Sequence, residues 1–397
     1  MNTTSHPPAG IAQREYGRLP DGRAVHEITL SNGAGLVLGA LTLGGIVNSL
    51  QVPDRHGARA NVVLGFDNLA DYVERNPHFG VIVGRYANRI ALGELEVDGE
   101  RHALTRNDGT NCLHGGGQGF GARLWEIESV HAHDAALGGP ALTLRYASAD
   151  GEEGFPGRVD ARVTYSLRLD ANTWQVDYTA TTDRATVVNL SHHDYFNLAG
   201  HGSAMDHVLT LHASRYHPVD ARLIPTGVAP VAGTPLDFRA PTAIRLRLDD
   251  PHPQLRLAGG YDHHWLLDAL ETDNAPGTPP RLAAQVLDPA SGRTLALSTT
   301  EPGLQFYSGN FLDGTLRGPA ARSTSAAPRC AWSPSTAPTR RTTRTGRPPC
   351  CARAPCTAAA RSTNSASRRG ADRGCEAARA RPRRRRASAP LPIAGTA

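Results

Sequence analysis

Alternating apolar and polar residues dominate the first 318 positions of this chain. Three runs alternate with a period of two, at 141–147 (ALTLRYA), 159–169 (VDARVTYSLRL) and 174–180 (WQVDYTA). In an extended strand this period turns one face toward a core and the other toward solvent or a second layer. Asp-Gly and Pro-Gly pairs at 98–99, 108–109, 150–151 and 156–157 indicate turns between the strands.

One segment departs from the alternation. Residues 67–76 (DNLADYVERN) are predicted to form a short helix with Asp67 as its N-cap. Many strands at regular spacing, with almost no helix, are typical of a large β-sandwich or barrel. We therefore expect an all-β protein, a large many-stranded β-sandwich that occupies residues 1–318.

The pattern ends near Pro319. Residues 319–397 consist mainly of Ala, Arg, Ser, Thr and Pro without periodicity, and Trp332 is their only aromatic residue. We expect this Arg-rich tail to be disordered, because it offers too little apolar surface to offset the entropy of ordering. The sandwich domain is accordingly expected to lack its C-terminal part.

Charge divides at the same point. All basic residues of the chain are Arg; the residues from Ala320 onward carry a net charge of +15, and the preceding part carries −10. A mildly acidic body does not favour nucleic acid as a partner. The basic isoelectric point comes entirely from the tail. If the tail is a natural segment, its composition is that of a disordered region that binds a polyanion.

Cysteine content and the N-terminus bear on the compartment. Only Cys112 lies in the body, so no disulfide framework is expected, as in proteins of a reducing compartment. Residues 1–17 lack a basic region followed by an apolar stretch, and the longest apolar stretch, 33–47, is too short and too rich in glycine to span a bilayer. We predict a cytoplasmic protein without membrane contact.

Two segments place polar groups among apolar residues. In 79–90 (FGVIVGRYANRI), Arg85, Asn88 and Arg89 are either surface groups at a strand end or donors for a polyhydroxyl ligand. In 107–120 (NDGTNCLHGGGQGF), His114 precedes glycines that would let the backbone approach a ligand closely. Taken alone, His114 is more often structural, and the glycines lack the Lys-Ser/Thr of a phosphate-binding loop.

Two further segments concentrate titratable groups. In 189–198 (NLSHHDYFNL), a histidine near its ordinary pKa of about 6.5 suits a general acid. His192 and His193 are adjacent in a predicted strand and point to opposite faces, so we expect no shared metal ion. In 260–265 (GYDHHW), Asp262 is either a turn residue or an acceptor for sugar hydroxyls, and aromatic neighbours could stack on a ring.

Taken together, these motifs resemble one family. NRI (88–90), LHGG (113–116), H-x-YFNL (193–198), YDH (261–263) and Q-x-Y-x-GN (305–310) occur in this order. The chain up to about residue 318 closely resembles the aldose 1-epimerases, or galactose mutarotases. The resemblance implies a many-stranded β-sandwich that binds a free hexose without metal or cofactor. It also implies ring opening by general acid–base catalysis, in which a histidine protonates the ring oxygen and a glutamate takes the proton of the anomeric hydroxyl.

Carried over by motif, the resemblance implies that His193 is the general acid. His192 stands where the family usually has Asn. The substrate-binding positions that the resemblance implies are Arg85, Asn88, Arg89, His114, Tyr195, Asp262 and Gln305.

The glutamate base of the family has no counterpart in the written sequence. The family places it in an LE-x-Q-x-x-PD motif, roughly twenty to thirty residues beyond the part that resembles 309–312, whereas residues 319–370 contain no Asp or Glu. The last base of the Trp332 codon and the first two of an AG-type Ser333 codon would read as glutamate. The triplets that follow can then read PQH-x-PD-x-PNHPD. We therefore interpret the tail as a translation in a shifted reading frame, so that this chain lacks its base and has little activity.

Two functions remain open at this point. The first is an aldose 1-epimerase, favoured as a monomer, that acts on a small hexose but lacks its base; Glu301 is expected to be a solvated turn residue rather than a substitute. The second is a non-catalytic sugar-binding β-sandwich with a basic tail that binds a polyanion. Rereading the gene around the Pro319 codon would discriminate between them.

Overall fold

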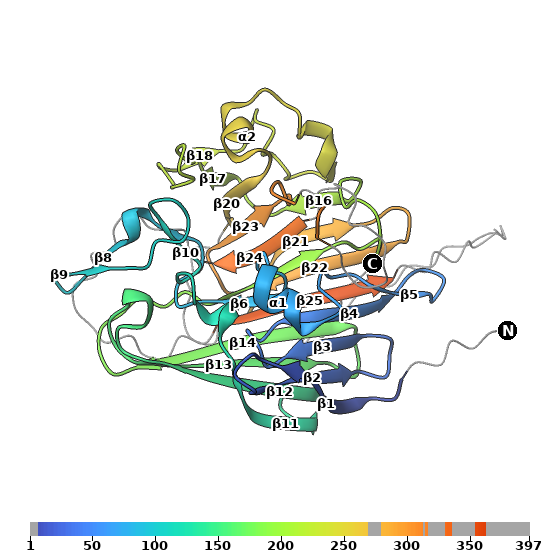
Figure 1. Ribbon diagram of the computed structural model, residues 1–397. Helices are drawn as coiled ribbons and strands as arrows, with labels where there is room; N and C mark the ends of the chain where they lie inside the picture. Colours follow the sequence, from blue (N-terminus) through green and yellow to red (C-terminus); the bar gives the residue numbers. More distant parts are fainter. Residues whose placement is uncertain (1–6, 269–278, 313, 317–329, 336–353, 363–397) are drawn as a thin grey trace, which may run out of the picture.

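Antiparallel strands make up most of the protein in the computed structural model, which confirms the expected all-β class (Figure 1). The structure describes residues 7–268, 279–312, 314–316, 330–335 and 354–362. Every pairing between named strands in these ranges is antiparallel, and the strands form two large sheets, a smaller sheet and two short ribbons, which the next paragraphs define.

The largest sheet has nine strands. In spatial order they are β11 (Glu126–Asp134), β12 (Gly139–Ser148), β13 (Val159–Leu167), β14 (Thr173–Thr182), β25 (Ala354–Ser362), β22 (Arg293–Thr299), β21 (Arg281–Leu287), β16 (Val208–Leu211) and β19 (Thr242–Ala243).

A seven-stranded sheet carries most of the polar motifs. In spatial order its strands are β18 (Ala229–Pro230), β17 (Arg215–His217), β20 (Asp262–Leu266), β23 (Gly303–Tyr307), β24 (Cys330–Ser335), β15 (Ser191–Phe196) and β6 (Val81–Val83).

The remaining strands form one five-stranded sheet and two ribbons. The sheet contains β1 (Gly10–Arg18), β2 (Ala24–Ser31), β3 (Val37–Leu41), β4 (Val47–Pro53) and β5 (Arg59–Asn61). The ribbons pair β7 (Arg89–Ile90) with β10 (Cys112–Leu113), and β8 (Glu94–Val97) with β9 (Glu100–Ala103). The helical segments are α1 (Leu69–Arg75), α2 (Pro253–Ala258), and the 3₁₀ turns η1 (Ala91–Gly93), η2 (Phe120–Ala122), η3 (Glu152–Gly154) and η4 (Ile244–Arg247).

The sequence alternation sets the sheet faces. In β13, Val159, Val163 and Tyr165 are fully buried, whereas Asp160 and Arg162 face outward and form an ion pair of 2.9 Å. Each fully buried side chain of this size stabilises the fold by about 1.5–3 kcal/mol. One apolar cluster joins residues of all three sheets, so the sheets pack against a common core, as a sandwich requires.

The predicted helix exists, but its cap differs. The helix α1 begins at Leu69, and the side chain of Asn68, not Asp67, accepts a hydrogen bond of 3.0 Å from the backbone N–H of Asp71. The N-cap prediction was therefore wrong by one residue. Both residue types favour this position, so composition alone does not select between neighbours.

The tail contributes two strands. β24 lies between β15 and β23, and β25 lies between β14 and β22. The prediction of disorder is wrong for these two segments, because each finds partners with open backbone groups on both sides. The β-structure therefore continues past residue 318. The other residues of the tail lie outside the part of the chain that the structure describes.

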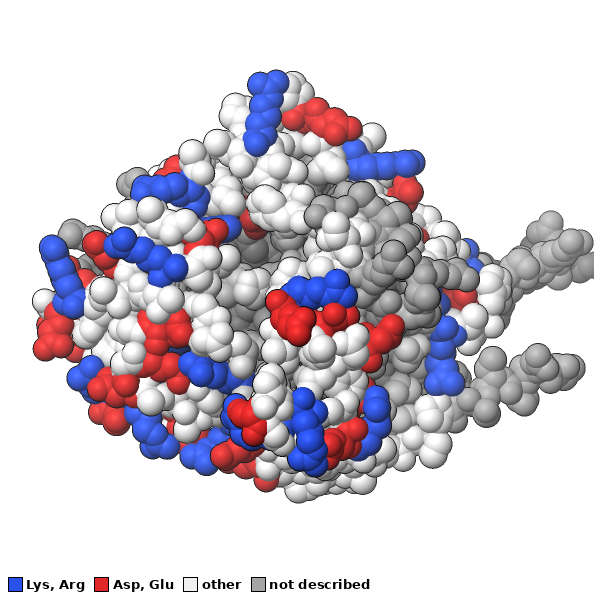
Figure 2. All heavy atoms as spheres, in the orientation of Figure 1, with Lys and Arg blue, Asp and Glu red and all other residues white. Residues whose placement is uncertain are grey.

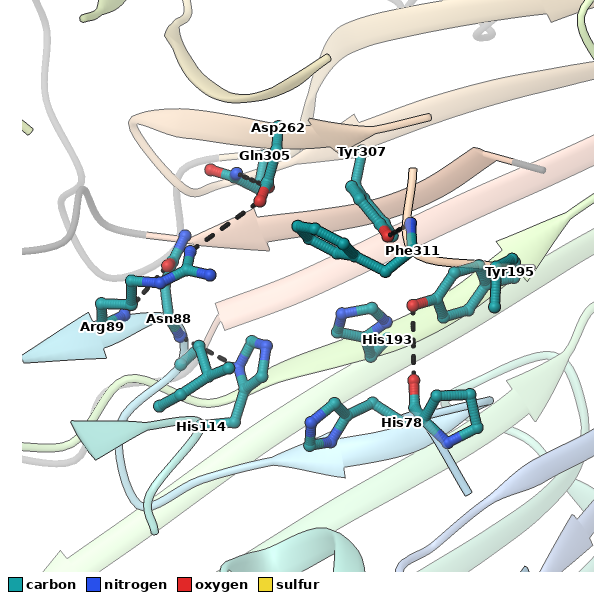
Figure 3. Close-up of a pocket in the computed structure, with 14 residues that line it drawn as sticks. His78, Asn88, Arg89, His114, His193, Tyr195, Asp262, Gln305, Tyr307 and Phe311 are labelled. Atoms are coloured by element: carbon teal, nitrogen blue, oxygen red, sulfur yellow. Dashed lines mark hydrogen bonds and ion pairs between the residues drawn. The ribbon is translucent and has the colours of Figure 1, made fainter. Parts of the chain in front are cut away.

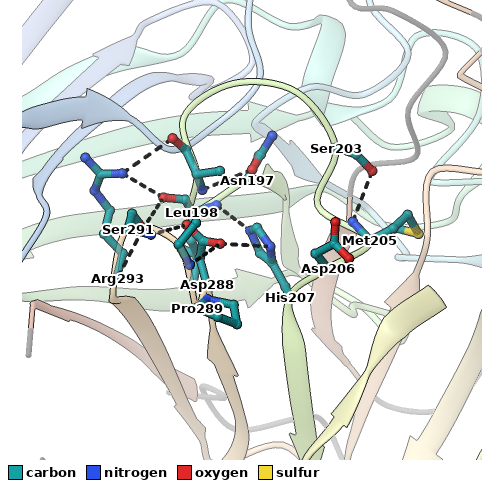
Figure 4. Close-up of polar contacts among 12 residues, drawn as sticks. Asn197, Leu198, Ser203, Met205, Asp206, His207, Asp288, Pro289, Ser291 and Arg293 are labelled. Carbon is teal, nitrogen blue, oxygen red and sulfur yellow. Dashed lines mark hydrogen bonds and ion pairs between the residues drawn. The ribbon is translucent and has the colours of Figure 1, made fainter. Parts of the chain in front are cut away.

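A buried polar cluster fixes the loop after β15 (Figure 4). The guanidinium of Arg293 donates to the carbonyl oxygens of Val52 at 3.1 Å and Leu198 at 2.9 Å. The backbone N–H of Leu198 donates to Nε2 of His207 at 2.9 Å, and Asp288 lies 3.9 Å from that ring. The β4–β5 hairpin, this loop and the β21–β22 turn are thereby held together, which anchors the C-terminal end of β15.

Candidate active site

A cavity of about 180 Å³ lies against the seven-stranded sheet (Figure 3). Its walls come from β7, β10, β15, β20 and β23, and from the segments next to β6 and β23. A concave site of this size suits one small molecule rather than a polymer. The lining residues are Pro77, His78, Ala87, Asn88, Arg89, Leu113, His114, His193, Tyr195, Asp262, Gln305, Tyr307, Phe311 and Leu312.

The structure brings together all but one of the residues singled out in the sequence. Those that line the cavity are Asn88, Arg89, His114, His193, Tyr195, Asp262 and Gln305. They come from five strands or loops that are far apart in the sequence, and the sheet topology makes them neighbours.

Arg85 does not line the cavity. Its guanidinium is buried and donates to the carbonyl oxygens of Ala149, Pro156 and Gly157 and to the hydroxyl of Ser148, at 2.7–2.9 Å. These contacts hold the β12–β13 connection, and the predicted role in substrate binding gains no support from this placement. The strand β6 ends at Val83, so the alternation that would put Arg85 and Arg89 on one face does not reach them.

His114 presents a hydrogen-bond donor to the cavity. The backbone N–H of Asn88 donates to its Nδ1 at 3.1 Å, so the hydrogen of the neutral ring is on Nε2. Burial holds the pKa of His114 well below its usual value, which keeps the ring neutral. Asn88 and His114 have φ angles of 68° and 52°, a strained conformation of the kind that clusters at functional sites.

The glycines after His114 serve packing rather than approach to a ligand. A Cβ atom on Gly115 would lie 2.0 Å from the carbonyl oxygen of Gly84, and one on Gly116 would lie 2.2 Å from the Glu153 carboxylate. Both glycines have positive φ angles. The loop is therefore packed closely against the segment after β6, which fixes His114, and the expectation of close backbone approach to a ligand was wrong at these two positions.

Asp262 is held in the cavity wall beside Gln305 and Arg89. The amide of Gln305 donates to Oδ1 of Asp262 at 2.7 Å, and the Arg89 guanidinium lies 3.8 Å from Oδ2. Arg89 also pairs with Asp108 at 2.7 Å. Burial raises the pKa of Asp262, and the nearby Arg89 opposes that rise. The remaining lone pairs of this carboxylate are placed to accept hydrogen bonds from hydroxyl groups.

The two adjacent histidines of β15 face opposite sides of the sheet. His193 lines the cavity, its Nδ1 is without a hydrogen-bond partner among the described residues, and burial lowers its pKa to about 3. His192 points into the core, where its ring nitrogens contact Asp194 at 2.7 Å and Tyr165 at 3.0 Å. In the ranges that the structure describes, no group of three His, Cys, Asp or Glu could hold a metal ion.

A third histidine was missed in the sequence. The ring of His78 lies 4.8 Å from that of His114 and 5.7 Å from that of His193, between ring centres, and His114 and His193 are 5.1 Å apart. His78 stands between a proline and a phenylalanine directly before the 79–90 motif. The sequence around His78 is typical of an ordinary turn. No periodic pattern in the sequence indicates that His78 lies near His193.

Aromatic residues at the rim were missed too. Tyr307 and Phe311 stack with ring centres 6.0 Å apart, and the backbone N–H of Phe311 donates to the Tyr307 hydroxyl oxygen at 2.8 Å. Phe311 is 70% exposed, which is costly for a phenyl ring that faces only water. The ring therefore offers an apolar platform beside the polar end of the cavity.

The strand β24 passes beside the cavity. It lies between β15 and β23, with Asp194 opposite Trp332 and Gln305 opposite Ser333. Position 333 is therefore the strand partner of a residue that lines the cavity. Asp262 is the only carboxylate among the described residues that line the cavity.

The visible surface is mixed in charge. Figure 2 shows basic and acidic side chains interspersed over one face, without a broad area of one sign among the described residues. No helix in the described ranges is long and apolar enough to cross a membrane.

Comparisons with known proteins agree with this geometry. A family model described as aldose 1-epimerase matches residues 26–341. The chain is 41% identical to the galactose mutarotase of Pongo abelii over 313 residues, which cover 78% of this chain and 85% of the relative. It is 38% identical to the aldose 1-epimerase of Escherichia coli K12 over 300 residues, or 75% and 82% of the two chains.

A solved structure has the same fold. The galactose 1-epimerase of Lactobacillus acidophilus superimposes with a TM-score of 0.76 at 26% identity, covering 89% of this chain and 99% of that one.

Proposed function

The chain belongs to the aldose 1-epimerase family of isomerases, and from that premise we propose that its cavity binds a free hexose and interconverts its α and β anomers. The observation that carries the proposal is the gathering of Arg89, His114, His193 and Asp262 around one small cavity. Buried donors and acceptors with open valences match a ligand made of hydroxyl groups.

His193 is the proposed general acid. It is the cavity-facing histidine of β15, and a proton on its free nitrogen could reach the ring oxygen of a bound sugar. Burial, with a further contribution from the nearby His78, lowers its pKa to about 3, so the ring is neutral at pH 7 and a weak acid. A carboxylate beside it would favour the charged form and raise that pKa, so the acid and the base of this reaction support each other.

Position 333 is the proposed place of the base. The shifted reading of the Trp332 and Ser333 codons gives glutamate at this point, and position 333 is the strand partner of Gln305, a residue that lines the cavity. We propose that the reading frame changes near Pro319 and that the chain as written therefore binds hexoses but epimerises them slowly. Independent sequencing of the gene across the Pro319 codon tests the frame directly.

The catalytic test is the Ser333→Glu variant. Polarimetry of freshly dissolved α-glucose and α-galactose should show mutarotation about a hundred- to ten-thousand-fold faster than with the parent chain, the usual contribution of a positioned base. Ser333→Gln, which has similar size and no basic group, is the matched control and should stay at the parental rate. A Ser333→Glu chain that folds, binds galactose and does not accelerate mutarotation would favour the non-catalytic sugar-binding function.

We also propose that the protein acts as a cytoplasmic monomer. The single described free cysteine, Cys112, is buried, which suits a reducing compartment. Size-exclusion chromatography with light scattering would test the monomer, which a mass of twice 42.2 kDa would contradict.

A further inference from the structure

We propose that His78 is a catalytic residue of this cavity: it accepts the proton of the anomeric hydroxyl while His193 donates a proton to the ring oxygen. This inference rests on the proposed function and adds a second proton carrier to it. It predicts that the chain as written has a residual rate without a glutamate.

The position of His78 is fixed by its neighbours. The Asn76 side chain accepts from the backbone N–H of Phe79 at 2.7 Å and donates to the carbonyl of the same residue at 3.4 Å. The Tyr195 hydroxyl donates to the carbonyl of Pro77 at 3.3 Å. These contacts bracket His78, which has a φ angle of 70°. A strained residue held from both sides cannot easily turn away from the cavity.

The ring nitrogens of His78 are free to react. No other described residue forms a hydrogen bond or ion pair with them, and the ring is partly buried at the cavity wall. By contrast, Nδ1 of His114 already accepts the backbone N–H of Asn88, and Asp262 is occupied by Gln305 and lies near Arg89. Besides the proposed acid His193, His78 is therefore the unengaged imidazole among the described residues that line the cavity.

The distance to His193 fits a hexose. The anomeric and ring oxygens are both bonded to C1, so the base and the acid must act within a few ångströms of each other. The two ring centres are 5.7 Å apart, which leaves room for both oxygens to reach a nitrogen at hydrogen-bonding distance.

Protons and electrons balance within the pair. The lone pair of a His78 nitrogen takes the proton of O1, the O1–H electron pair forms the C1=O1 double bond, and the C1–O5 pair moves to O5. O5 takes the N–H proton of His193. A water molecule between the rings returns the proton from His78 to His193, so both end neutral. Rotation about C1–C2 and the reverse steps give the other anomer.

The basicity of His78 supports this role. Burial lowers its pKa to about 4, so the neutral, accepting form prevails at pH 7, with the basicity of an ordinary carboxylate. The other titratable or charged groups that line the cavity are Arg89, His114, His193, Tyr195, Asp262 and Tyr307.

The test removes the ring and restores it from solution. His78→Gly accepts the positive φ angle and leaves space for free imidazole. In the parent chain we expect the residual mutarotation rate to fall at least about tenfold, with galactose affinity by calorimetry changed less than about threefold. Added imidazole should recover part of the loss, beyond its own catalysis measured without protein. In the Ser333→Glu chain the loss should shrink to a few-fold, because the carboxylate competes for the same proton.

The outcomes separate the two proposals. A parental residual rate that is absent, or unchanged in His78→Gly, overturns the role of His78, and so does a rate abolished by Asp262→Asn alone. Equal losses in both backgrounds, without imidazole rescue, would make His78 a positioning residue and also overturn it. If Ser333→Glu folds and binds galactose but accelerates no hexose, the proposed function fails instead.

Discussion

The cavity and the cluster around Arg293 contain the same kinds of buried polar residue and use them differently. Arg293 directs its guanidinium at carbonyl oxygens from two separate segments, and the His207 ring accepts a backbone N–H (Figure 4). At the cavity, His78 has no hydrogen-bond partner among the described residues, and Nδ1 of His193 has none (Figure 3). Buried polar groups are normally paired, so unpaired ones at a concave wall indicate the place of a ligand.

The same contrast separates neighbours in one strand. The ring nitrogens of His192 contact Asp194 and Tyr165, whereas Nδ1 of His193 has no hydrogen-bond partner among the described residues. Arg85 and Arg89 also differ in their partners, since the terminal nitrogens of Arg85 donate to backbone carbonyls and the Ser148 hydroxyl, whereas Arg89 pairs with Asp108 and lies near Asp262. Residue type and local sequence therefore do not distinguish a structural group from a binding group. The hydrogen-bond partners of each side chain do distinguish them.

Lowering the pH should produce the largest effect, a loss of unfolding free energy caused by the buried histidines. The pKa is lowered to about 4 for His78 and to about 3 for His193 and His263, in each case by burial. A lowered histidine pKa gives stability that is complete above the unfolded value of about 6.5 and is lost as pH falls toward the folded value. These three protons alone give a slope of about 4 kcal/mol per pH unit, to which His114 and His207, whose pKa values are also lowered, add.

Urea unfolding at pH 7.0, 6.0 and 5.0 measures this loss. His263 is paired with the Gln254 side chain in the core, so His263→Gln should reduce the slope by about one proton. An unfolding free energy that stays level from pH 7 to pH 5 would contradict the neutral, buried state of these rings.

The two histidines of β15 provide the next test. In the Ser333→Glu chain, His193→Ala should lower kcat about a hundred- to ten-thousand-fold, because a positioned acid contributes this much. His192→Asn should leave kcat within a few-fold but lower the melting temperature, since it removes at least one of two buried hydrogen bonds, worth about 1 kcal/mol each. Polarimetry and thermal unfolding of both variants measure the two effects, and a shared loss of kcat would mean that the faces are assigned wrongly.

Substitutions of Arg85 and Arg89 should affect different properties, the first mainly the unfolding free energy and the second mainly galactose affinity. Arg85→Ala leaves several buried carbonyls without their donor and should cost roughly 3 kcal/mol or more of unfolding free energy. Arg89→Ala removes a cation near Asp262 and should weaken galactose binding about tenfold or more, at a smaller cost in stability. Urea titration and calorimetry give both numbers for each variant. A binding loss in Arg85→Ala at full stability would restore its predicted role as a ligand.

Part of this architecture follows from sequence alone. The alternation in 159–167 predicts β13 because burial on one face needs only a local pattern. The family motifs predict seven of the cavity residues. The place of Arg85 could not be predicted, because its strand ends before it and its partners are more than sixty residues away. His78 likewise depends on a turn whose direction is set by Tyr195.

The tail shows the opposite error. Its composition predicts disorder, yet β24 and β25 pair on both sides within the two large sheets. Pairing with β15 and β14, which are more than a hundred residues away in the sequence, depends on backbone groups that these strands leave open. Composition describes only the residues of the segment itself. It contains no information on the unpaired backbone N–H and C=O groups of the adjoining strands.

Phe311 should show the smallest effect, and it tests whether the rim belongs to the site. Its ring is 70% exposed and stacks on Tyr307, so Phe311→Ala removes little packing and should change the melting temperature by only a degree or two. Stacking of a ring face on the C–H face of a sugar is worth about 1 kcal/mol, comparable with other aromatic pairs, so galactose affinity should fall roughly fivefold. Phe311→Leu keeps the apolar surface without the flat face and should fall between the two. Calorimetric titration of the three chains with galactose decides the matter: equal affinities would exclude the rim from the site, and a loss in Phe311→Ala that Phe311→Leu fully repairs would show that apolar contact, rather than stacking, is what the exposed ring supplies.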